Sequence, residues 1–163
     1  MKESRFPAKG SCLLRSGRWS SPGNSYFVTS STFDHVPIFV DPACCQIVFN
    51  SIDWLEDGKR LECYCSVIMP EHVHLVIELG PEQTPSRVMQ SLKGYTANKI
   101  NDLRGRRGRV WQDQYYDHLV RTEEEMMSVI LYCYENPVRR SLVEKASDYP
   151  FWRCKFDMSN GRG

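Results

Sequence analysis

The chain has 163 residues, a length that fits one domain with a sizeable hydrophobic core. Its hydrophobic fraction of 41% and charged fraction of 25% are ordinary for a folded globular domain. The formal net charge is only +1, so any contact with nucleic acid has to come from a local basic stripe. The chain shows neither an apolar run of membrane length nor a secretion signal, so we expect a cytoplasmic protein without a membrane partner.

The seven cysteines are an odd number, and no two of them have the C-x-x-C spacing of a zinc knuckle. This usage predicts buried, reduced thiols rather than a disulfide framework. Cys63 and Cys65 lie two residues apart in an expected strand, and strand alternation predicts that both thiols point to the same face.

The first half of the chain is expected to contain three strands and one helix. Residues 25–32 are rich in aromatic residues, Val and Thr, which favours a strand. Apolar residues recur at three- and four-residue spacing over residues 42–55 and predict a helix. Residues 61–69 and 72–79 are two further strands, and the short break between them implies an antiparallel hairpin.

The second half begins with a helix that we expect from Pro85 to about Leu103, with Thr84 as its N-cap. Residues 110–120 are mostly extended.

A further helix is expected from Glu123 to about Asn136, because Thr122 and Glu125 fit a capping box. Pro137 is expected to end it, since the residue before proline disfavours the helical conformation. A short final helix is expected to begin at Pro137 or Val138.

This order of elements predicts an α+β fold of the ferredoxin-like, split β-α-β type. Its antiparallel sheet would carry two helices on one face, leaving the other face free for a site, and would be followed by a C-terminal helix. We expect a basic arm over residues 1–24, one domain over 25–152 and a tail over 153–163.

The most informative tripeptide is His72-Val73-His74 in the third expected strand. Alternation places Val73 on the core face and both imidazoles on the opposite face. Two adjacent imidazoles can begin a divalent metal site, although a third protein ligand is needed to complete it. The alternative is a pair of surface histidines on the solvated side of the sheet.

Tyr132 and Asn136 lie four residues apart and share one face of the expected helix from Glu123. A tyrosine presented beside a metal-binding carboxamide suits phosphoryl transfer, in which a phenolate attacks a polarised phosphate. The alternative is that Tyr132 packs in the core and Asn136 serves the end of the helix.

Several stretches, in the same order, resemble one superfamily of DNA-processing enzymes. Residues 69–76 (MPEHVHLV) look like the metal-binding strand of the HUH single-strand nucleases. The REP-associated tyrosine transposases within that superfamily are similar at residues 22–29 (PGNSYFVT), 110–112 (VWQ), 116–121 (YDHLVR), 132–138 (YCYENPV) and 148–152 (DYPFW).

The resemblance implies a metal-dependent strand transferase that cuts and joins single-stranded DNA at palindromic REP hairpins through a covalent 5′-phosphotyrosine. His72 and His74 would be metal ligands and Tyr132 the nucleophile. Asn136 would be the third ligand, where many relatives have glutamine. The ion would be Mg²⁺ or Mn²⁺, although Zn²⁺ also fits these ligand types. No nucleotide cofactor is expected, because the chain has no G-x-x-x-x-G-K-[ST] loop.

A DNA surface is expected from basic and aromatic side chains, together with the N-terminal arm. The candidates are Lys93, Arg104, Arg106, Arg107, Arg109, Trp111, Tyr116, Arg121, Arg139 and Arg140. Aromatic rings can stack on unpaired bases, but Trp111 could equally pack in the core and each cation could be a solvated surface charge.

His118 is a candidate catalytic helper, for which a structural hydrogen bond is an equal alternative. Tyr115, Tyr116 and Tyr134 are rival nucleophiles.

Two other functions remain open at this point. A non-catalytic single-stranded nucleic-acid-binding domain would bind without forming a covalent product. A hydrolytic metal phosphodiesterase would use water, with Tyr132 as a structural residue. The short link between residues 116–120 and the Tyr132 helix favours a monomer with its site in one chain, and a dimer stays possible.

Overall fold

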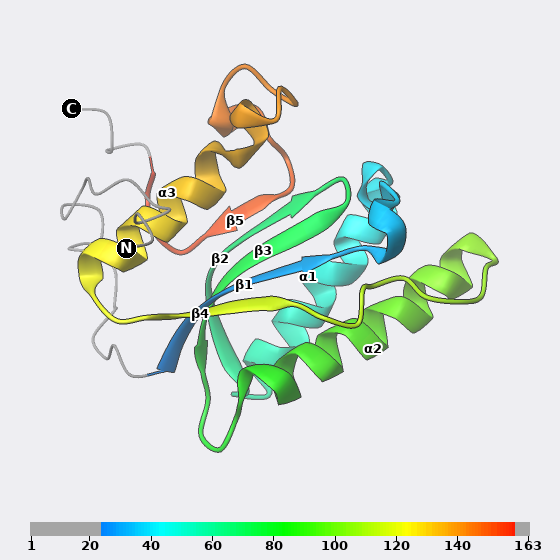
Figure 1. Ribbon diagram of the computed structural model, residues 1–163, viewed down its shortest axis with the longest axis horizontal. Helices are drawn as coiled ribbons and strands as arrows, with labels where there is room; N and C mark the ends of the chain where they lie inside the picture. The colour runs from blue at the N-terminus through cyan, green and yellow to red at the C-terminus, as the bar shows by residue number, and fades with distance from the viewer. Residues whose placement is uncertain (1–23, 159–163) are drawn as a thin grey trace.

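The computed structural model describes residues 24–158, and the proposed basic arm at residues 1–24 lies almost entirely outside that range (Figure 1). The strands and main helices, in chain order, are β1 (Ser25–Ser31), α1 (Pro42–Asp57), β2 (Leu61–Met69), β3 (His72–Leu79), α2 (Pro85–Arg104), β4 (Tyr116–Val120), α3 (Glu123–Arg139) and β5 (Trp152–Cys154). Three short 3₁₀ helices add η3 (Phe33–His35), η4 (Ile38–Val40) and η5 (Ala146–Asp148).

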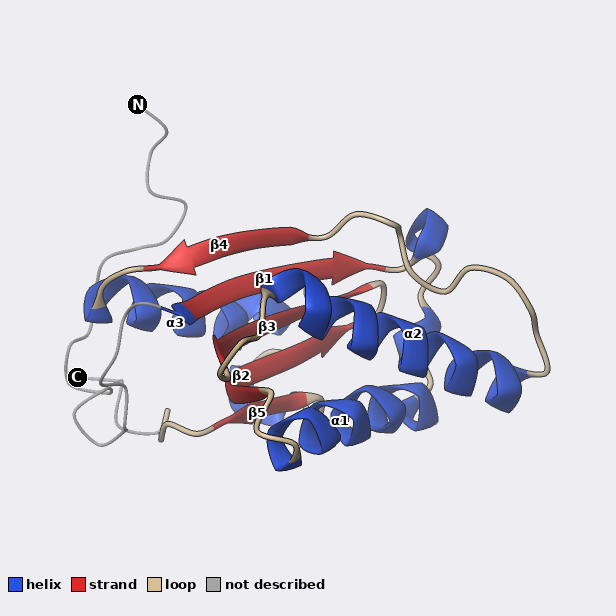
Figure 2. Ribbon diagram, turned by 90° about the horizontal axis from the view of Figure 1, so that it is seen from below, coloured by secondary structure: helices blue, strands red, loops and turns tan. Residues whose placement is uncertain are grey.

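The five strands form one sheet in the order β4-β1-β3-β2-β5, and every neighbouring pair is antiparallel. The first four strands have the ferredoxin-like order, so the expected α+β fold class is confirmed. Helices α1 and α2 lie together against one face, and α3 lies on the other side of the sheet (Figures 1 and 2). The second face is therefore covered by α3 rather than left free.

Each face of the sheet has its own apolar core. Val73, Leu75 and Ile77 of β3 pack with α1 and α2, as alternation predicted. The Val76 side chain points to the opposite face of the sheet and packs with Phe27 and with the apolar side of α3. Both histidines of β3 consequently lie on the α3 side of the sheet, next to this second core.

A β-bulge in β2 overturns the expectation for its two cysteines. Cys63 pairs with Ile77, whereas Cys65 pairs with Val76, so the register shifts by one residue between them. Cys63 therefore packs with the α1 and α2 core and Cys65 with the α3 core. An extra residue in a strand reverses the alternation beyond it, and the sequence pattern gave no sign of this.

The six described cysteines are free, and five of them are buried, as composition predicted; Cys12 lies outside the described residues. Among the described residues, no helix combines the length and apolar character that crossing a bilayer requires.

Helix α3 begins as predicted, because the Thr122 hydroxyl accepts a hydrogen bond from the Glu125 amide at 3.1 Å. Its expected end was wrong: the helix continues through Pro137 to Arg139, and no new helix begins at Pro137. Proline so near a helix end removes few intrahelical bonds. The Arg140 amide still donates to the Asn136 carbonyl at 3.0 Å. Burial of Asn136 and Pro137 outweighs the local preference.

The sheet also continues into the segment expected to be a tail. Residues 152–154 form β5 against β2, and the Lys155 amide donates to the Tyr64 carbonyl at 2.8 Å. Phe156 is buried and stacks on Tyr64 with ring centroids 5.7 Å apart. This segment, at least to Phe156, is thus part of the folded domain.

Candidate active site

The two histidines of β3 converge instead of facing solvent. Their Nε2 atoms are 3.1 Å apart and their ring centroids 4.6 Å apart. His74 is only 4% exposed, and His72 is half-buried. The alternative of two solvated surface histidines is therefore wrong, because α3 encloses this part of the sheet.

The opposite nitrogen of each ring is held by a neighbouring side chain. His74 Nδ1 lies 2.7 Å from Thr29 Oγ1, and Thr29 is its partner across the β1–β3 ladder. His72 Nδ1 lies 3.0 Å from a carboxylate oxygen of Glu71, to which Arg140 also donates at 2.7 Å. A carboxylate accepts, so His72 donates from Nδ1 and its Nε2 carries the lone pair. Such partners fix the tautomer and orientation of a metal-binding imidazole.

Burial of the ring favours the neutral, ligand form of His72. Burial lowers the pKa of His72, and this outweighs the Glu71 carboxylate, which raises it. Burial also raises the pKa of Glu71, but the Arg140 hydrogen bond and the neighbouring His72 bring it below its ordinary value. Glu71 is accordingly an anion that orients His72.

The geometry of the pair suits one small divalent ion. Two ligands about 2.1 Å from an ion and about 90° apart at that ion lie about 3 Å from each other. The observed separation of 3.1 Å meets that condition. Within residues 24–158, no group of three or more His, Cys, Asp or Glu side chains forms a metal-binding cluster.

Tyr132 joins the histidines from α3. Its ring centroid is 5.6 Å from that of His74 and 6.0 Å from that of Phe27, which itself stacks on His74 at 5.4 Å. The Arg139 guanidinium lies 4.3 Å over the Tyr132 ring and donates to the Tyr132 carbonyl at 2.6 Å. The Tyr132 ring therefore contacts His74 and lies beside the Arg139 cation, and all three residues belong to one chain.

Asn136 lies one helical turn beyond Tyr132 and is buried. In the part of the chain that the structure describes, no hydrogen bond joins its carboxamide to either histidine. Its assignment as third ligand stays a prediction.

His118 of β4 lies opposite Phe27 in the ladder and makes a short hydrogen bond from Nε2 to Glu125 of α3. Glu125 also accepts from the Arg121 amide at 2.8 Å, so its carboxylate ties β4 to the start of α3. The structural alternative for His118 is therefore realised, and a catalytic role stays a prediction.

Lys93 and Trp111, both expected at the DNA surface, have structural roles here. Lys93 Nζ donates to the carbonyls of Gln112 at 2.5 Å and Asp113 at 3.1 Å, and burial lowers its pKa. Trp111 is 5% exposed, packs against Phe39 and donates from its indole nitrogen to Thr96 Oγ1 at 2.9 Å. Trp111 is thus a core residue, and its ring is not free to stack on a base.

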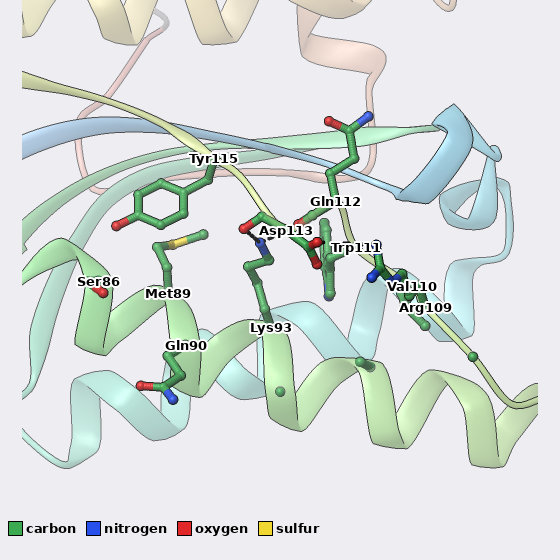
Figure 3. Close-up of a pocket in the computed structure, with 13 residues that line it drawn as sticks. Ser86, Met89, Gln90, Lys93, Arg109, Val110, Trp111, Gln112, Asp113 and Tyr115 are labelled. Carbon is green, nitrogen blue, oxygen red and sulfur yellow. Dashed lines mark hydrogen bonds and ion pairs between the residues drawn. The ribbon is translucent and has the colours of Figure 1, made fainter.

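These two side chains fix the wall of an open groove of about 560 Å³ between α2 and residues 108–115 (Figure 3). In that view Lys93 rises from α2 towards Asp113, and the Met89 and Gln90 side chains lie along the helix beside it.

The other expected DNA contacts remain at the surface. Exposed side chains include Arg104, Arg106, Arg107, Arg109, Tyr116, Arg121, Arg139 and Arg140. Three of them have protein partners, since Arg109 pairs with Asp113 at 3.2 Å, Arg139 with Glu135 at 3.7 Å and Arg140 with Glu71 at 2.7 Å. Tyr116 is 44% exposed and meets Phe27 edge to face.

The rival tyrosines have other surroundings. Tyr134 packs on Trp152 with centroids 5.2 Å apart, and Tyr115 lies beside Lys93 at the groove. Of the four candidates, Tyr132 is the one whose ring contact with His74 the structure describes, with centroids 5.6 Å apart.

Three residues at the site were not predicted from the sequence. Thr29 and Glu71 anchor the outer nitrogens of the histidines. His35, in the loop after β1, lies near enough to contribute to lowering the pKa of His72, and its Nε2 lies 3.2 Å from Gln112 Nε2. The position of Glu71 next to His72 in the sequence was a sign that it could contact that ring. Thr29 and His35 are far from the histidines in the sequence, and tertiary folding brings them close.

A ferredoxin-like sheet with paired histidines and a tyrosine helix across it is consistent with a DNA-processing enzyme. The family model described as "Transposase IS200 like" matches residues 36–134, more than half of the chain, and the chain belongs to this family. The REP-associated tyrosine transposase of Escherichia coli K12 is 26% identical over 119 residues, which are 71% of this chain and 68% of that protein.

A solved structure described as the REP-associated tyrosine transposase bound to a REP hairpin has the same fold. Its TM-score is 0.68 at 22% identity, covering 83% of this chain and 79% of the other. The resemblance to REP-associated tyrosine transposases is thereby confirmed.

Proposed function

We propose that this chain is a metal-dependent transposase-type enzyme that cuts and joins single-stranded DNA, with Tyr132 as its nucleophile. The carrying observation is the convergence of His72 and His74, whose Nε2 atoms are 3.1 Å apart, with the Tyr132 ring packed against His74. A pair of lone-pair nitrogens beside a phenol is the arrangement that activated phosphoryl transfer needs.

His72 and His74 would hold one divalent ion, Mg²⁺ or Mn²⁺, with Asn136 as the proposed third ligand. When bound, that ion would supply positive charge to a phosphate oxygen of the scissile linkage. Thr29 and Glu71 would keep both rings in the ligand orientation, because each binds the Nδ1 atom of one ring.

The Tyr132 oxygen attacks the scissile phosphorus in line with the leaving oxygen. A Tyr132 oxygen–phosphorus bond forms and the phosphorus–O3′ bond breaks. The phenol loses its proton to solvent and the O3′ atom takes one up. The products are a 5′-phosphotyrosine and a free 3′-hydroxyl, so one phosphorus–oxygen ester bond is exchanged for another. A 3′-hydroxyl can reverse the step and join strands without ATP.

Two cations next to the nucleophile would guide the strand. Arg139 lies over the Tyr132 ring, and Arg140 is bound to Glu71 beside His72. Arginine binds phosphate oxygens in forked geometry, which supports the proposal that both contact phosphates of the strand near Tyr132.

The proposed substrate is DNA that folds into a REP-type hairpin with unpaired flanks. The similarity to a protein whose solved structure is described as bound to a REP hairpin supports this choice. The presence of His72, His74 and Tyr132 together in one chain supports a monomer as the active unit.

The test is covalent trapping on a labelled hairpin oligonucleotide with single-stranded flanks, in Mn²⁺ or Mg²⁺ and in EDTA. The expected result is a protein–DNA adduct on a denaturing gel that requires the ion and disappears in Tyr132→Phe and His72→Ala. Tyr134→Phe is the matched control, because Tyr134 is two residues away on the same helix and packs on Trp152, and it should retain the adduct.

Two outcomes would replace the proposal by its competitors. Cleavage that survives Tyr132→Phe and leaves no adduct would indicate a hydrolytic phosphodiesterase. Binding of hairpins from the flanks of the protein's own gene, without any cleavage in either ion, would indicate a non-catalytic binding domain.

A further inference from the structure

A second cavity, of about 200 Å³, lies where the loop after β1 meets the turn after α2. Its lining combines apolar and charged side chains, chiefly Phe33, Asp34, Val36, Arg104, Arg106 and Arg107. None of the roles described above for the histidines and Tyr132 uses this cavity.

The cavity lies at the end of the sheet where the histidine strand begins. The Thr32 amide donates to the Glu71 carbonyl at 2.8 Å, and the Phe33 amide donates to the Val110 carbonyl at 2.9 Å. The loop that forms one wall of the cavity is thus bonded directly to the residue before His72. A strand crossing the histidines could reach this cavity within a few nucleotides.

Two apolar side chains of the lining are exposed, although the other apolar residues of the lining are buried. Phe33 is 37% exposed and Val36 39% exposed, and the Arg109 guanidinium lies 5.4 Å over the Phe33 ring. An exposed aromatic ring with a neighbouring arginine is the combination on which unpaired bases stack.

The charged part of the lining favours a nucleotide over a simple anion. Arg104, Arg106 and Arg107 would attract phosphate, but the Asp34 carboxylate in the same lining would repel a bare anion. A carboxylate can accept hydrogen bonds from the amino or imino groups of a base. In a nucleotide, the phosphate can pair with the arginines and the base can donate hydrogen bonds to Asp34.

The arginine turn is held in shape before any ligand arrives. The Arg106 amide donates to the Asn101 carbonyl, and the Asn101 side-chain amide donates to the Gly108 carbonyl, both at 2.9 Å. Gly105 and Gly108 have positive φ angles of 59° and 113°, which glycine adopts without strain. A preformed turn loses little entropy on binding.

We propose that this cavity binds one unpaired nucleotide of the DNA substrate, with its base against Phe33 and Val36 and its phosphates at Arg104, Arg106 and Arg107. The inference rests on the proposed function only in requiring that the chain binds single-stranded DNA. Phe33 is a specificity-determining residue in this account and takes no part in the chemical step.

The experiment scans a single abasic site through the unpaired flanks of a hairpin oligonucleotide and measures affinity by fluorescence anisotropy at fixed salt. The Tyr132→Phe background keeps the DNA intact. We expect one flank position at which loss of the base weakens binding about tenfold. Phe33→Ala should weaken binding of intact DNA by a similar factor and should add no further loss at that abasic position.

Trp54→Ala is the matched control, because Trp54 is an exposed aromatic on α1 with the Arg60 guanidinium 6.0 Å from its ring centroid. It should leave affinity unchanged. Arg107→Gln is a second variant, and we expect it to lower the slope of log affinity against log salt by about one for every sequence.

The proposed nucleotide site would be overturned if affinity fell equally at all abasic positions. It would also be overturned if the losses of affinity from Phe33→Ala and from the abasic position were additive. An adduct at Tyr132 without position-dependent binding would overturn this inference and leave the proposed function intact. Position-dependent binding without an adduct would support this inference and overturn the proposed function. Failure to bind any of these oligonucleotides would overturn both.

Discussion

At the scale of single residues, the site depends on how two imidazoles are aimed. Thr29 binds Nδ1 of His74 and Glu71 binds Nδ1 of His72, which leaves both Nε2 atoms facing each other. Without an ion, one of these nitrogens must donate to the other. With an ion between them both must offer lone pairs, and the Thr29 hydroxyl can then accept from His74, because a hydroxyl serves in either role.

Removing the Thr29 hydroxyl should therefore weaken ion binding without removing a ligand. Thr29→Val keeps the shape of the side chain, and we expect Mn²⁺ affinity measured by calorimetry to fall about 10- to 100-fold. Thr29→Ser retains the hydroxyl and should keep most of the affinity. Equal affinities for the valine variant and the unmodified protein would show that Thr29 does not position His74.

At the scale of elements, Tyr132 is placed by the junction between β4 and α3. The Glu125 carboxylate bonds both His118 of β4 and the Arg121 amide ahead of the helix. Burial alone would raise the pKa of Glu125, but these two partners bring it below its ordinary value. The carboxylate consequently stabilises the fold when ionised and fixes the start of the helix that carries Tyr132, the proposed nucleophile.

A carboxyl group with a lowered pKa in the folded state stabilises the protein above its unfolded pKa, and the effect disappears as pH falls through the folded value. Glu125→Gln should thus lower the free energy of unfolding by about 1 kcal/mol at pH 7. The difference from the unmodified protein should shrink as pH falls below about 4.5. Urea unfolding at a series of pH values measures this. A difference that is constant across the series would contradict the role of the ionised group.

Elements whose sequence pattern is local were predictable, and those decided by distant contacts were not. The alternation of β3 fixed which face carries Val73 and which carries the histidines. By contrast, the bulge between Cys63 and Cys65 changes the phase of β2 without a turn residue to mark it. Pro137 indicated a helix end locally, but burial of the last turn of α3 keeps the helix intact.

The same distinction holds for the site. Strand alternation predicted that His72 and His74 share one face. The nucleophile role of Tyr132 was predicted from the resemblance of residues 132–138 to a known family. Thr29 could not be assigned, because its position opposite His74 depends on the register between β1 and β3, which are separated by a helix and a strand. The packing of Trp111 on Phe39 is another long-range contact that composition does not reveal.

At the scale of the whole molecule, the sheet separates two apolar cores, and the site lies on the α3 side. Both the histidines and Tyr132 belong to one chain, and α3 reaches the sheet directly from β4. One molecule therefore contains the proposed ligands and the proposed nucleophile together. This arrangement is the basis on which we propose cis assembly.

A mixing experiment distinguishes cis from trans assembly. Tyr132→Phe and His72→Ala, each inactive alone, should form no adduct when they are mixed in equal amounts, since neither molecule has a complete site. Restoration of about a quarter to a half of the unmodified activity, measured by adduct formation, would show that a site is shared between two chains.

The most direct test of the central claim is to identify the residue that becomes attached to DNA. The adduct would be trapped with Mn²⁺, digested with protease and nuclease, and examined by tandem mass spectrometry. We expect a phosphonucleotide on the Tyr132 oxygen, at the 5′ end of the cleaved strand. A modification on Tyr134, Tyr115 or Tyr116, or cleaved DNA with no modified peptide, would contradict the account.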